Sequence, residues 1–304
     1  MNLVSNVYKK IRFPFKIILA SSMYFFIYKK VKTVKVLSIN ETLDYLINNP
    51  HLSIARYGDG ELEMLHYKNI GFQTFNKKLS DKLVEVLNDV EKNKNCLVCM
   101  PDGFFNTKNF KAGPSIFWFF HKAFFFHKYN KFLSRNYTFG NTSVTRPYND
   151  YKSKINAPNV FNKFRNLLSG LRVLIVEGVG TKLGVGNDLL NTTACVLRIT
   201  TLNKNAFDLY DEIYNSVIEH KNMYDIVLIS LGPTATILSF DLSKVGIRCI
   251  DTGHIDIEYE WMLSNASSKT AVAGKNVNEV GTVSSENNQL NNKEYISQII
   301  KHIS

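Results

Sequence analysis

Two carboxylates separated by a single glycine offer the clearest candidate for chemistry in this sequence. Asp59 and Glu61 lie in the segment RYGDGE (56–61), directly after an apolar run. Side chains at this spacing can both reach one hard divalent cation, since Mg²⁺ or Mn²⁺ is held by one or two carboxylates together with substrate phosphates. The segment therefore predicts a metal site beneath a diphosphate, although acids at this position can also serve only to cap a helix.

The residues just before this pair also suit a bound diphosphate. Arg56 offers a planar guanidinium for phosphate oxygens, and Gly58 permits tight backbone geometry. The run over residues 51–58 predicts a strand, and ligands of open α/β sheets bind at the carboxyl ends of strands. We therefore expect Arg56 and Gly58 to contact the bound diphosphate.

A glycine-rich segment, EGVGTKLGVGND (177–188), follows a second predicted strand. Its four glycines and lysine can bring backbone N–H groups and a positive charge close to an anion. The spacing matches neither the Walker P-loop nor the dinucleotide fingerprint, so NAD is not expected. A connection without any ligand is the alternative. The candidates for binding a phosphate-bearing ligand here are Lys182, Gly184, Gly186, Asn187 and Asp188.

Two further segments follow predicted strands. The segment GPTAT (232–236) begins a helix, so its N–H groups and Thr234 can meet an anion. In HIDIEYEW (254–261), His254 is a further candidate for nucleotide-sugar contact. If the diphosphate is the leaving group of a transfer to an acceptor hydroxyl, that hydroxyl needs a base, and the candidates are Asp256, Glu258 and Glu260. If this segment is extended, His254 and the three acids point to one side. If it is helical, His254 and Glu258 share a face. The alternative is a polar edge that only contacts solvent.

The elements that must position these residues alternate between short apolar runs and amphipathic stretches. This pattern is typical of the α/β class, here a Rossmann-like, mostly parallel sheet flanked by helices. The expected strands are residues 51–58, 96–101, 171–178, 194–200, 225–232 and 247–253. The expected helices are residues 80–93 with Ser80 as the cap, 113–135, 205–220, 234–246 and, after a polar stretch over 264–292, residues 293–303.

Positive charge gathers at the N-terminus. The first forty residues carry eight lysines and arginines and no acid, whereas the other 29 basic and 26 acidic residues nearly balance, which argues against nucleic-acid binding. Residues 17–28 are uncharged, but a membrane-spanning helix needs roughly 20 apolar residues. We therefore expect residues 1–35 to form a basic amphipathic arm that contacts a membrane surface through residues 9–35. A buried or partner-facing helix and a cleaved signal peptide are the alternatives.

Domain organisation and location follow from the same patterns. We expect a catalytic domain over residues 36–263 and a polar tail with a short helix over residues 264–304. Cys96 and Cys99 lie in an apolar run, and no second pair follows at zinc-site spacing, so both are expected to be core thiols of a reducing cytoplasm. The expected location is cytoplasmic and peripheral, on the inner face of the cell membrane.

Five motifs in consistent order resemble the bacterial GT-D-fold glycosyltransferases, a family first described as a domain of unknown function. They are RYGDGE, VEGVGTKLGVGND, NAFDLYDEI, LGPTATILSFDL and DTGHIDIEYEW, and GKNVNEV (274–280) resembles the family's closing segment. The resemblance implies a catalytic domain that uses a UDP-sugar and Mn²⁺ or Mg²⁺, with its DxE motif on Asp59 and Glu61. The sequence departs from the pattern at Val179, where a charged residue is expected, and in its basic arm, which suggests a lipid-borne acceptor.

The sequence thus predicts a metal-dependent glycosyltransferase of polysaccharide biosynthesis. It would move glucose or another hexose from a UDP-sugar to a glycan or lipid-linked glycan. One alternative is a non-catalytic nucleotide-sugar-binding scaffold, which would bind metal and UDP without forming product. Another is a metal-dependent phosphatase or nucleotidase, which would release free phosphate instead of UDP. Arg146 and Arg198 are smaller candidates for substrate contact, although such residues more often form structural ion pairs.

Overall fold

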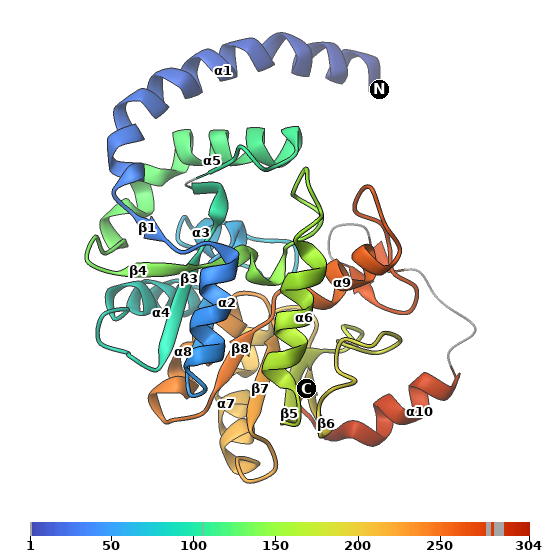
Figure 1. Cartoon of the computed structure of the whole chain (residues 1–304). Coiled ribbons are helices and arrows are strands. Elements are labelled where there is room, and N and C mark those ends of the chain that lie inside the picture. Colours follow the sequence, from blue (N-terminus) through green and yellow to red (C-terminus); the bar gives the residue numbers. More distant parts are fainter. Residues whose placement is uncertain (1, 105, 278–280, 283–288) are drawn as a thin grey trace.

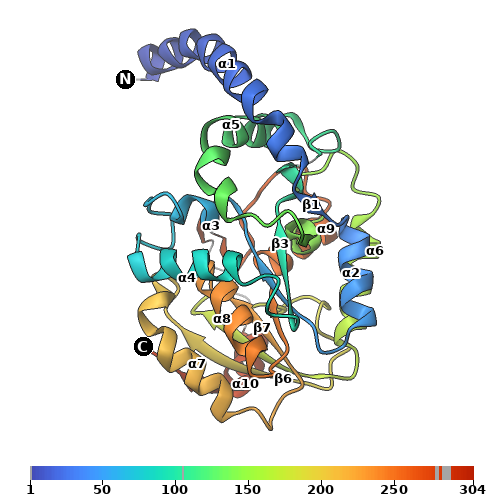
Figure 2. The ribbon, with the colours of Figure 1, turned by 90° about the vertical axis from the view of Figure 1, so that its left-hand side faces the viewer.

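The computed structural model describes residues 2–104, 106–277, 281–282 and 289–304, with the backbone alone for residues 2–12, 281–282 and 289–292. Its centre is a nine-stranded sheet in the order β1-β4-β3-β2-β8-β7-β5-β6-β11, and every strand pair in it is parallel. Helices cover both faces of the sheet (Figures 1 and 2). The predicted α/β class and Rossmann-like sheet are confirmed.

The strands are short, and most coincide with the apolar runs of the sequence. The sheet consists of β1 (Lys35–Val36), β2 (Ser53–Arg56), β3 (Cys96–Met100), β4 (Thr138–Asn141), β5 (Arg172–Gly178), β6 (Cys195–Thr201), β7 (Ile226–Ser230), β8 (Cys249–Asp251) and β11 (Ile299–His302). A separate two-stranded ribbon joins β9 (Asn276–Val277) to β10 (Gly281–Thr282). Cys96 and Cys99 are buried free thiols of β3, as expected.

The helices are α1 (Asn2–Lys32), α2 (Ile39–Asn48), α3 (Asp59–Met64), α4 (Lys77–Asn88), α5 (Ala112–Tyr129), α6 (Ala157–Leu168), α7 (Tyr210–Glu219), α8 (Pro233–Lys244), α9 (Ile255–Leu263) and α10 (Gln289–Gln298). Two core layers hold them on the sheet. Alternate strand residues point to opposite faces, so Ile54 of β2 packs in the layer beneath α2, α6 and α9, whereas Ala55 packs in the layer beneath α4, α7 and α8. A strand buried on both faces must be apolar throughout, which explains the continuous runs.

Two predictions about elements were wrong. Helix α4 begins at Lys77 with Asn76 as its cap, because the Asn76 side chain accepts the Leu79 N–H at 3.2 Å, and Ser80 lies buried inside the helix. The last helix ends at Gln298, and Ile299–His302 form β11, which pairs with β6 at the edge of the sheet. The C-terminal segment is thus part of the sheet rather than a tail that ends in a helix.

The N-terminal arm is a long helix that crosses the outside of α5 (Figures 1 and 2). Ring contacts join the two helices, with centroids 6.0 Å apart for Phe13 and Phe120 and 5.7 Å apart for Tyr24 and Phe119. Within the described residues, no helix combines the length and the apolar content that crossing a membrane requires.

Candidate active site

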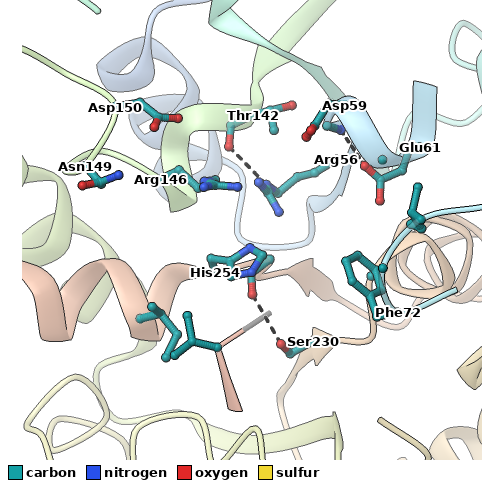
Figure 3. Close-up of a pocket in the computed structure, with 18 of the residues that line it drawn as sticks. Arg56, Asp59, Glu61, Phe72, Thr142, Arg146, Asn149, Asp150, Ser230 and His254 are labelled. Atoms are coloured by element: carbon teal, nitrogen blue, oxygen red, sulfur yellow. Dashed lines mark hydrogen bonds between the residues drawn. The ribbon is translucent and has the colours of Figure 1, made fainter. Parts of the chain in front are cut away.

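A cavity of about 1290 Å³ lies at the carboxyl ends of the central strands. Turns that follow β2, β3, β4, β5, β7 and β8 contribute to its wall, and so do the loop before α4 and the start of α5. The turn after a parallel strand lies at one edge of the sheet, so segments far apart in the sequence meet there. Figure 3 shows how Arg56, Arg146 and His254 converge between Asp59 and Glu61 on one side and Asp150 on the other.

Arg56 and Asp251 form a buried ion pair at the floor of this cavity. The Nη1 atom of Arg56 lies 3.3 Å from Oδ1 of Asp251, and Nε of Arg56 donates to the carbonyl oxygen of Thr142 at 3.1 Å (Figure 3). Burial raises the pKa of Asp251, and the charge of Arg56 opposes that rise. The hydroxyl of Thr236 donates to the same carboxylate at 3.1 Å. Much of the charge of Arg56 is therefore balanced inside the protein.

Asp59 and Glu61 both border the cavity from the first turn of α3. Asp59 is exposed, whereas Oε2 of Glu61 accepts the N–H of Gly58 at 2.7 Å and so closes the start of the helix. Loss of solvent and the nearby charge of Asp251 raise the pKa of Glu61 to about 7. The charge of Arg56 and the N–H of Gly58 offset this rise only in part, and a cation bound beside the carboxyl group would lower the pKa further.

Glu258 is buried beneath the segment that carries Arg146. Its Oε2 accepts the backbone N–H groups of Tyr148 and Asn149 at 2.9 and 2.8 Å, and its Oε1 lies 3.8 Å from Nε of Arg146. Desolvation raises the pKa of Glu258, and the charge of Arg146 is the largest influence that lowers it. The carboxylate does not line the cavity, so its structural role is to hold the 146–149 segment in place.

Asp256 and Glu260 connect α9 to the glycine-rich segment. Asp256 accepts the N–H of Gly184 at 2.9 Å and the amide of Asn187 at 2.8 Å. The buried ammonium group of Lys275 lies 2.7 Å from Asp256 and 2.9 Å from Glu260. Of these two acids only Asp256 lines the cavity. Buried carboxylates need such partners, and here the partners fix the glycine-rich segment against α9.

A family comparison bears directly on this arrangement. Residues 54–280 match the model of the family described as "Glycosyltransferase GT-D fold". The match runs from β2 through the cavity segments to Lys275 and the residues that follow it. The chain belongs to the GT-D glycosyltransferase family.

Two curated streptococcal proteins are similar to this GT-D chain. The "Probable glycosyl transferase Gly" of Streptococcus gordonii is 34% identical over 250 residues, which are 82% of this chain and 36% of that protein. Glycosyltransferase GlyD of Streptococcus pneumoniae serotype 4 (strain ATCC BAA-334 / TIGR4) is 32% identical over 278 residues, which are 90% of this chain and 33% of that protein. The chain therefore spans about a third of the length of the curated relatives it matches.

Solved structures agree with the GT-D assignment. One, described as "The highly conserved domain of unknown function 1792 has a distinct glycosyltransferase fold", superposes with a TM-score of 0.82 at 33% identity, covering 92% of this chain and 99% of that one. Another, "A New Glycosyltransferase (DUF1792) from Streptococcus sanguinis", gives a TM-score of 0.81 at 33% identity, covering 89% and 100%.

The structure brings some of the predicted site residues of the GT-D domain to the main cavity and places others elsewhere. Those that line it are Arg56, Gly58, Asp59, Glu61, His254 and Asp256. The glycine-rich segment reaches it through Gly178, Thr181 and Leu183, whereas Gly184, Gly186 and Asn187 border a smaller cavity of about 540 Å³. Three more predicted residues do not line the main cavity. Thr234 is fully buried in α8, Asp188 pairs with Arg165 at 2.8 Å, and Lys182 lies beside the ring of Tyr295.

Sequence reasoning missed several residues that line the cavity of the GT-D domain. Phe72 lies in the loop before α4 and packs over Gly232, where an added Cβ would come within 2.2 Å of its ring. Asp102 follows β3 and accepts the hydroxyl of Tyr151 at 2.9 Å. Asn149 and Asp150 follow Arg146, which was the only residue of that segment considered. The signal in the sequence that could have indicated these residues is a polar or aromatic residue shortly after a predicted strand or in a loop between helices.

Gly253 offers a test of the Arg56 arrangement in the GT-D domain. Its φ is +47°, and an added Cβ would lie 1.9 Å from Nη1 of Arg56. We expect Gly253→Ala to displace Arg56, to lower stability by about 1–3 kcal/mol and to lower turnover as well. The matched control is Gly170→Ala, which has a φ of +73° but no neighbour within 4 Å. Equal loss of turnover in both variants, measured beside thermal unfolding, would show that Arg56 is not involved.

Proposed function

We propose that this GT-D domain transfers a hexose, glucose or a close relative, from a UDP-sugar with the help of Mn²⁺ or Mg²⁺. The observation that carries the proposal is the position of Asp59 and Glu61 at one wall of a cavity lined also by Arg56, Arg146 and His254. Acids beside basic groups suit a diphosphate held through a cation. The cavity is also large enough for a nucleotide sugar, since small-molecule sites span about 300–1,000 Å³.

The residues present fit a hard divalent cation. No three His, Cys, Asp or Glu side chains among the described residues come together as a ready metal site, so Asp59 and Glu61 would hold the ion jointly with phosphate oxygens. When bound, the cation supplies positive charge that stabilises the departing diphosphate. Glu61 is oriented for this role by the N–H of Gly58.

The acceptor needs a base on the other side of the cavity. Asp256 lines the cavity, but Gly184, Asn187 and Lys275 already occupy its oxygens. We therefore assign to Asp256, with Glu258 and Glu260, the positioning of the site. Asp150 also lines the cavity, across Arg56 and Arg146 from Asp59 (Figure 3), and we propose its carboxylate as the group that takes the acceptor proton.

Replacing Asp150 or Asp256 by asparagine distinguishes the proposed base from the positioning residue. We expect Asp150→Asn to lower transfer by about 10²- to 10⁴-fold, as removal of a general base does, while UDP binding stays within a few-fold of the wild type. Asp256→Asn should weaken UDP binding and stability together, because the glycine-rich segment loses its anchor. Initial-rate kinetics and UDP titration measure both effects. A normal rate in Asp150→Asn would remove that residue from the mechanism.

A panel of nucleotide sugars tests the activity itself. Each donor is incubated with the protein, with and without Mn²⁺, and the released products are identified. Release of UDP from one UDP-hexose, dependent on the metal, supports the proposal. Release of free phosphate would favour the phosphatase or nucleotidase. Tight metal and UDP binding without any product would favour the scaffold.

The cellular setting is also a proposal. We propose a cytoplasmic enzyme that lies peripherally on the inner face of the cell membrane and transfers sugar to a glycan or lipid-linked glycan during polysaccharide biosynthesis. The support is the basic N-terminal helix, which carries no acid. Nucleotide sugars and anionic headgroups would both be accessible on that side.

A further inference from the structure

Over residues 13–32, where its side chains are described, helix α1 has two apolar sides, and only one of them is covered by the protein. Ala20, Ile27 and Val31 belong to the covered side, where Ala20 and Val31 are buried and Ile27 packs against the core. Tyr24 lies on the same side and contacts Phe119 of α5. The spacing of these four residues follows the helical repeat, so they form one stripe against α5 and the domain.

The uncovered side of α1 is also apolar. Five large side chains on it are 55–79% exposed, and we call them the outer stripe: Phe15, Ile18, Leu19, Phe25 and Phe26. Phe25 and Phe26 are the most exposed, at 79% each. Scattered single apolar residues on a surface are ordinary, whereas a contiguous exposed patch marks a surface that is covered in use.

Charge complementarity identifies what covers the outer stripe. The first forty residues hold eight basic residues and no acid, and Lys29, Lys30 and Lys32 lie at the end of α1. An apolar stripe flanked by lysines suits an anionic lipid surface, in which the rings enter the headgroup boundary and the lysines meet phosphates. Because the helix lacks the composition for crossing, it would lie along that surface.

Helix α5 connects this surface to the cavity. Phe119 and Phe120 contact α1, while Pro114, Phe117 and Trp118 line the cavity. Ile116 and Phe117 are neighbours on α5 and both are exposed, at 43% each, and Phe117 is the one of the two that lines the cavity. Figures 1 and 2 show α5 between α1 and the rest of the domain. A molecule anchored in the bilayer on which α1 lies would therefore reach the cavity along α5.

We propose that the outer stripe docks on an anionic membrane surface and that the acceptor is a lipid-anchored glycan, which enters the cavity past Ile116 and Phe117. This inference rests on the proposed function for its second half only. Membrane docking itself requires no enzymatic activity. The proposal gives α1 and α5 a role in selecting the acceptor, because docking on a bilayer brings a lipid-anchored glycan to the cavity but does not concentrate a water-soluble one.

Vesicle sedimentation tests the docking. The full chain is mixed with vesicles of phosphatidylcholine alone, or of phosphatidylcholine with phosphatidylglycerol. The variant Phe25→Ser/Phe26→Ser is compared with the control Met223→Ser/Val245→Ser, whose positions are also exposed but precede β7 and β8 at the opposite end of the sheet. We expect the wild type and the control to bind anionic vesicles, and the outer-stripe variant to bind on the order of tenfold more weakly. Binding should also weaken as salt rises.

Three results would overturn the docking. They are wild-type protein that stays in solution, an outer-stripe variant that binds as well as the wild type, and equal binding to neutral and anionic vesicles. Light scattering without vesicles tests whether a second copy of the chain, rather than a membrane, covers the outer stripe. A wild-type dimer that the outer-stripe variant dissociates, together with no vesicle binding, would mean that a second copy covers the stripe.

Acceptor choice is tested with a pair of alkyl glycosides, one with a long chain held in anionic vesicles and one with a short chain in solution. The wild type should transfer sugar faster to the vesicle-held glycoside, and the outer-stripe variant should lose that preference while hydrolysing the donor normally in buffer. No preference in the wild type would overturn the lipid-anchored acceptor. If neither the wild type nor the variants hydrolyse the donor, the result counts against the proposed function, whereas vesicle sedimentation still tests membrane docking.

Discussion

Replacement of Asp59 by asparagine is expected to lower the rate of sugar transfer by about 10²- to 10³-fold, as the loss of one well-placed electrostatic contact does. Asparagine keeps the shape of the side chain and removes the charge that we propose for the cation. Asp59 is exposed at the start of α3, so the fold should survive the change. Initial rates of UDP release and transfer, measured with saturating metal, check the result.

The control for this variant is Asp81→Asn. Asp81 is also an exposed acid near the start of a helix, where it pairs with Lys77 at 2.6 Å, but it does not line the cavity. An exposed pair of this kind contributes only about 0–1 kcal/mol, so both stability and rate should remain close to the wild type. Near-normal turnover in Asp59→Asn would remove the proposed role of this carboxylate.

Replacement of Arg198 by leucine is expected to lower stability by about 3–5 kcal/mol, because the buried carboxylate of Glu177 would lose its counter-charge. Nη1 of Arg198 lies 2.7 Å from Oε1 of Glu177, and the two side chains are 2% and 0% exposed. Arg198 also donates to the carbonyl oxygen of Leu183 at 2.9 Å, while Glu177 accepts the Leu183 N–H at 2.8 Å. The ion pair therefore holds the glycine-rich segment at the end of β5.

Thermal unfolding should show this loss as a decrease in Tm on the order of 10 °C. Burial already raises the pKa of Glu177, and the charge of Arg198 opposes that rise, so removal of Arg198 should raise the pKa further. The control is Arg172→Leu on β5, the strand of Glu177, which breaks an exposed pair with Asp225 at 2.7 Å. A similar Tm for the two variants would contradict the claim that the buried Arg198–Glu177 pair stabilises the fold more than the exposed Arg172–Asp225 pair.

The central strands could be predicted because they are buried on both faces. Residues such as Val173 and Leu174 enter opposite core layers, so the whole run must be apolar and is visible in the sequence. Residues 299–302 were not predicted as a strand. This edge segment is only four residues long and follows directly on a helix, and so short a run carries no period of its own.

The site was only partly predictable, because its pairings are distant in sequence. The position of Asp59 and Glu61 followed from the local rule that ligands bind after strands. The ion pair of Arg56 with Asp251 joins residues 195 positions apart, and nothing local indicates it. The acids of α9 illustrate the same limit. Glu258 and Asp256 were visible as acids, but only the structure shows that Tyr148, Asn149, Gly184 and Lys275 engage them.

Calorimetric titration of UDP in the presence and absence of Mn²⁺ tests the central claim most directly. If Asp59 and Glu61 hold a cation jointly with the diphosphate, Mn²⁺ should tighten UDP binding to the wild type by at least about tenfold, and Asp59→Asn should remove that gain, because the coupling between two ligands is reciprocal. Equal UDP affinity with and without Mn²⁺ in the wild type, or an undiminished gain in Asp59→Asn, would contradict the account.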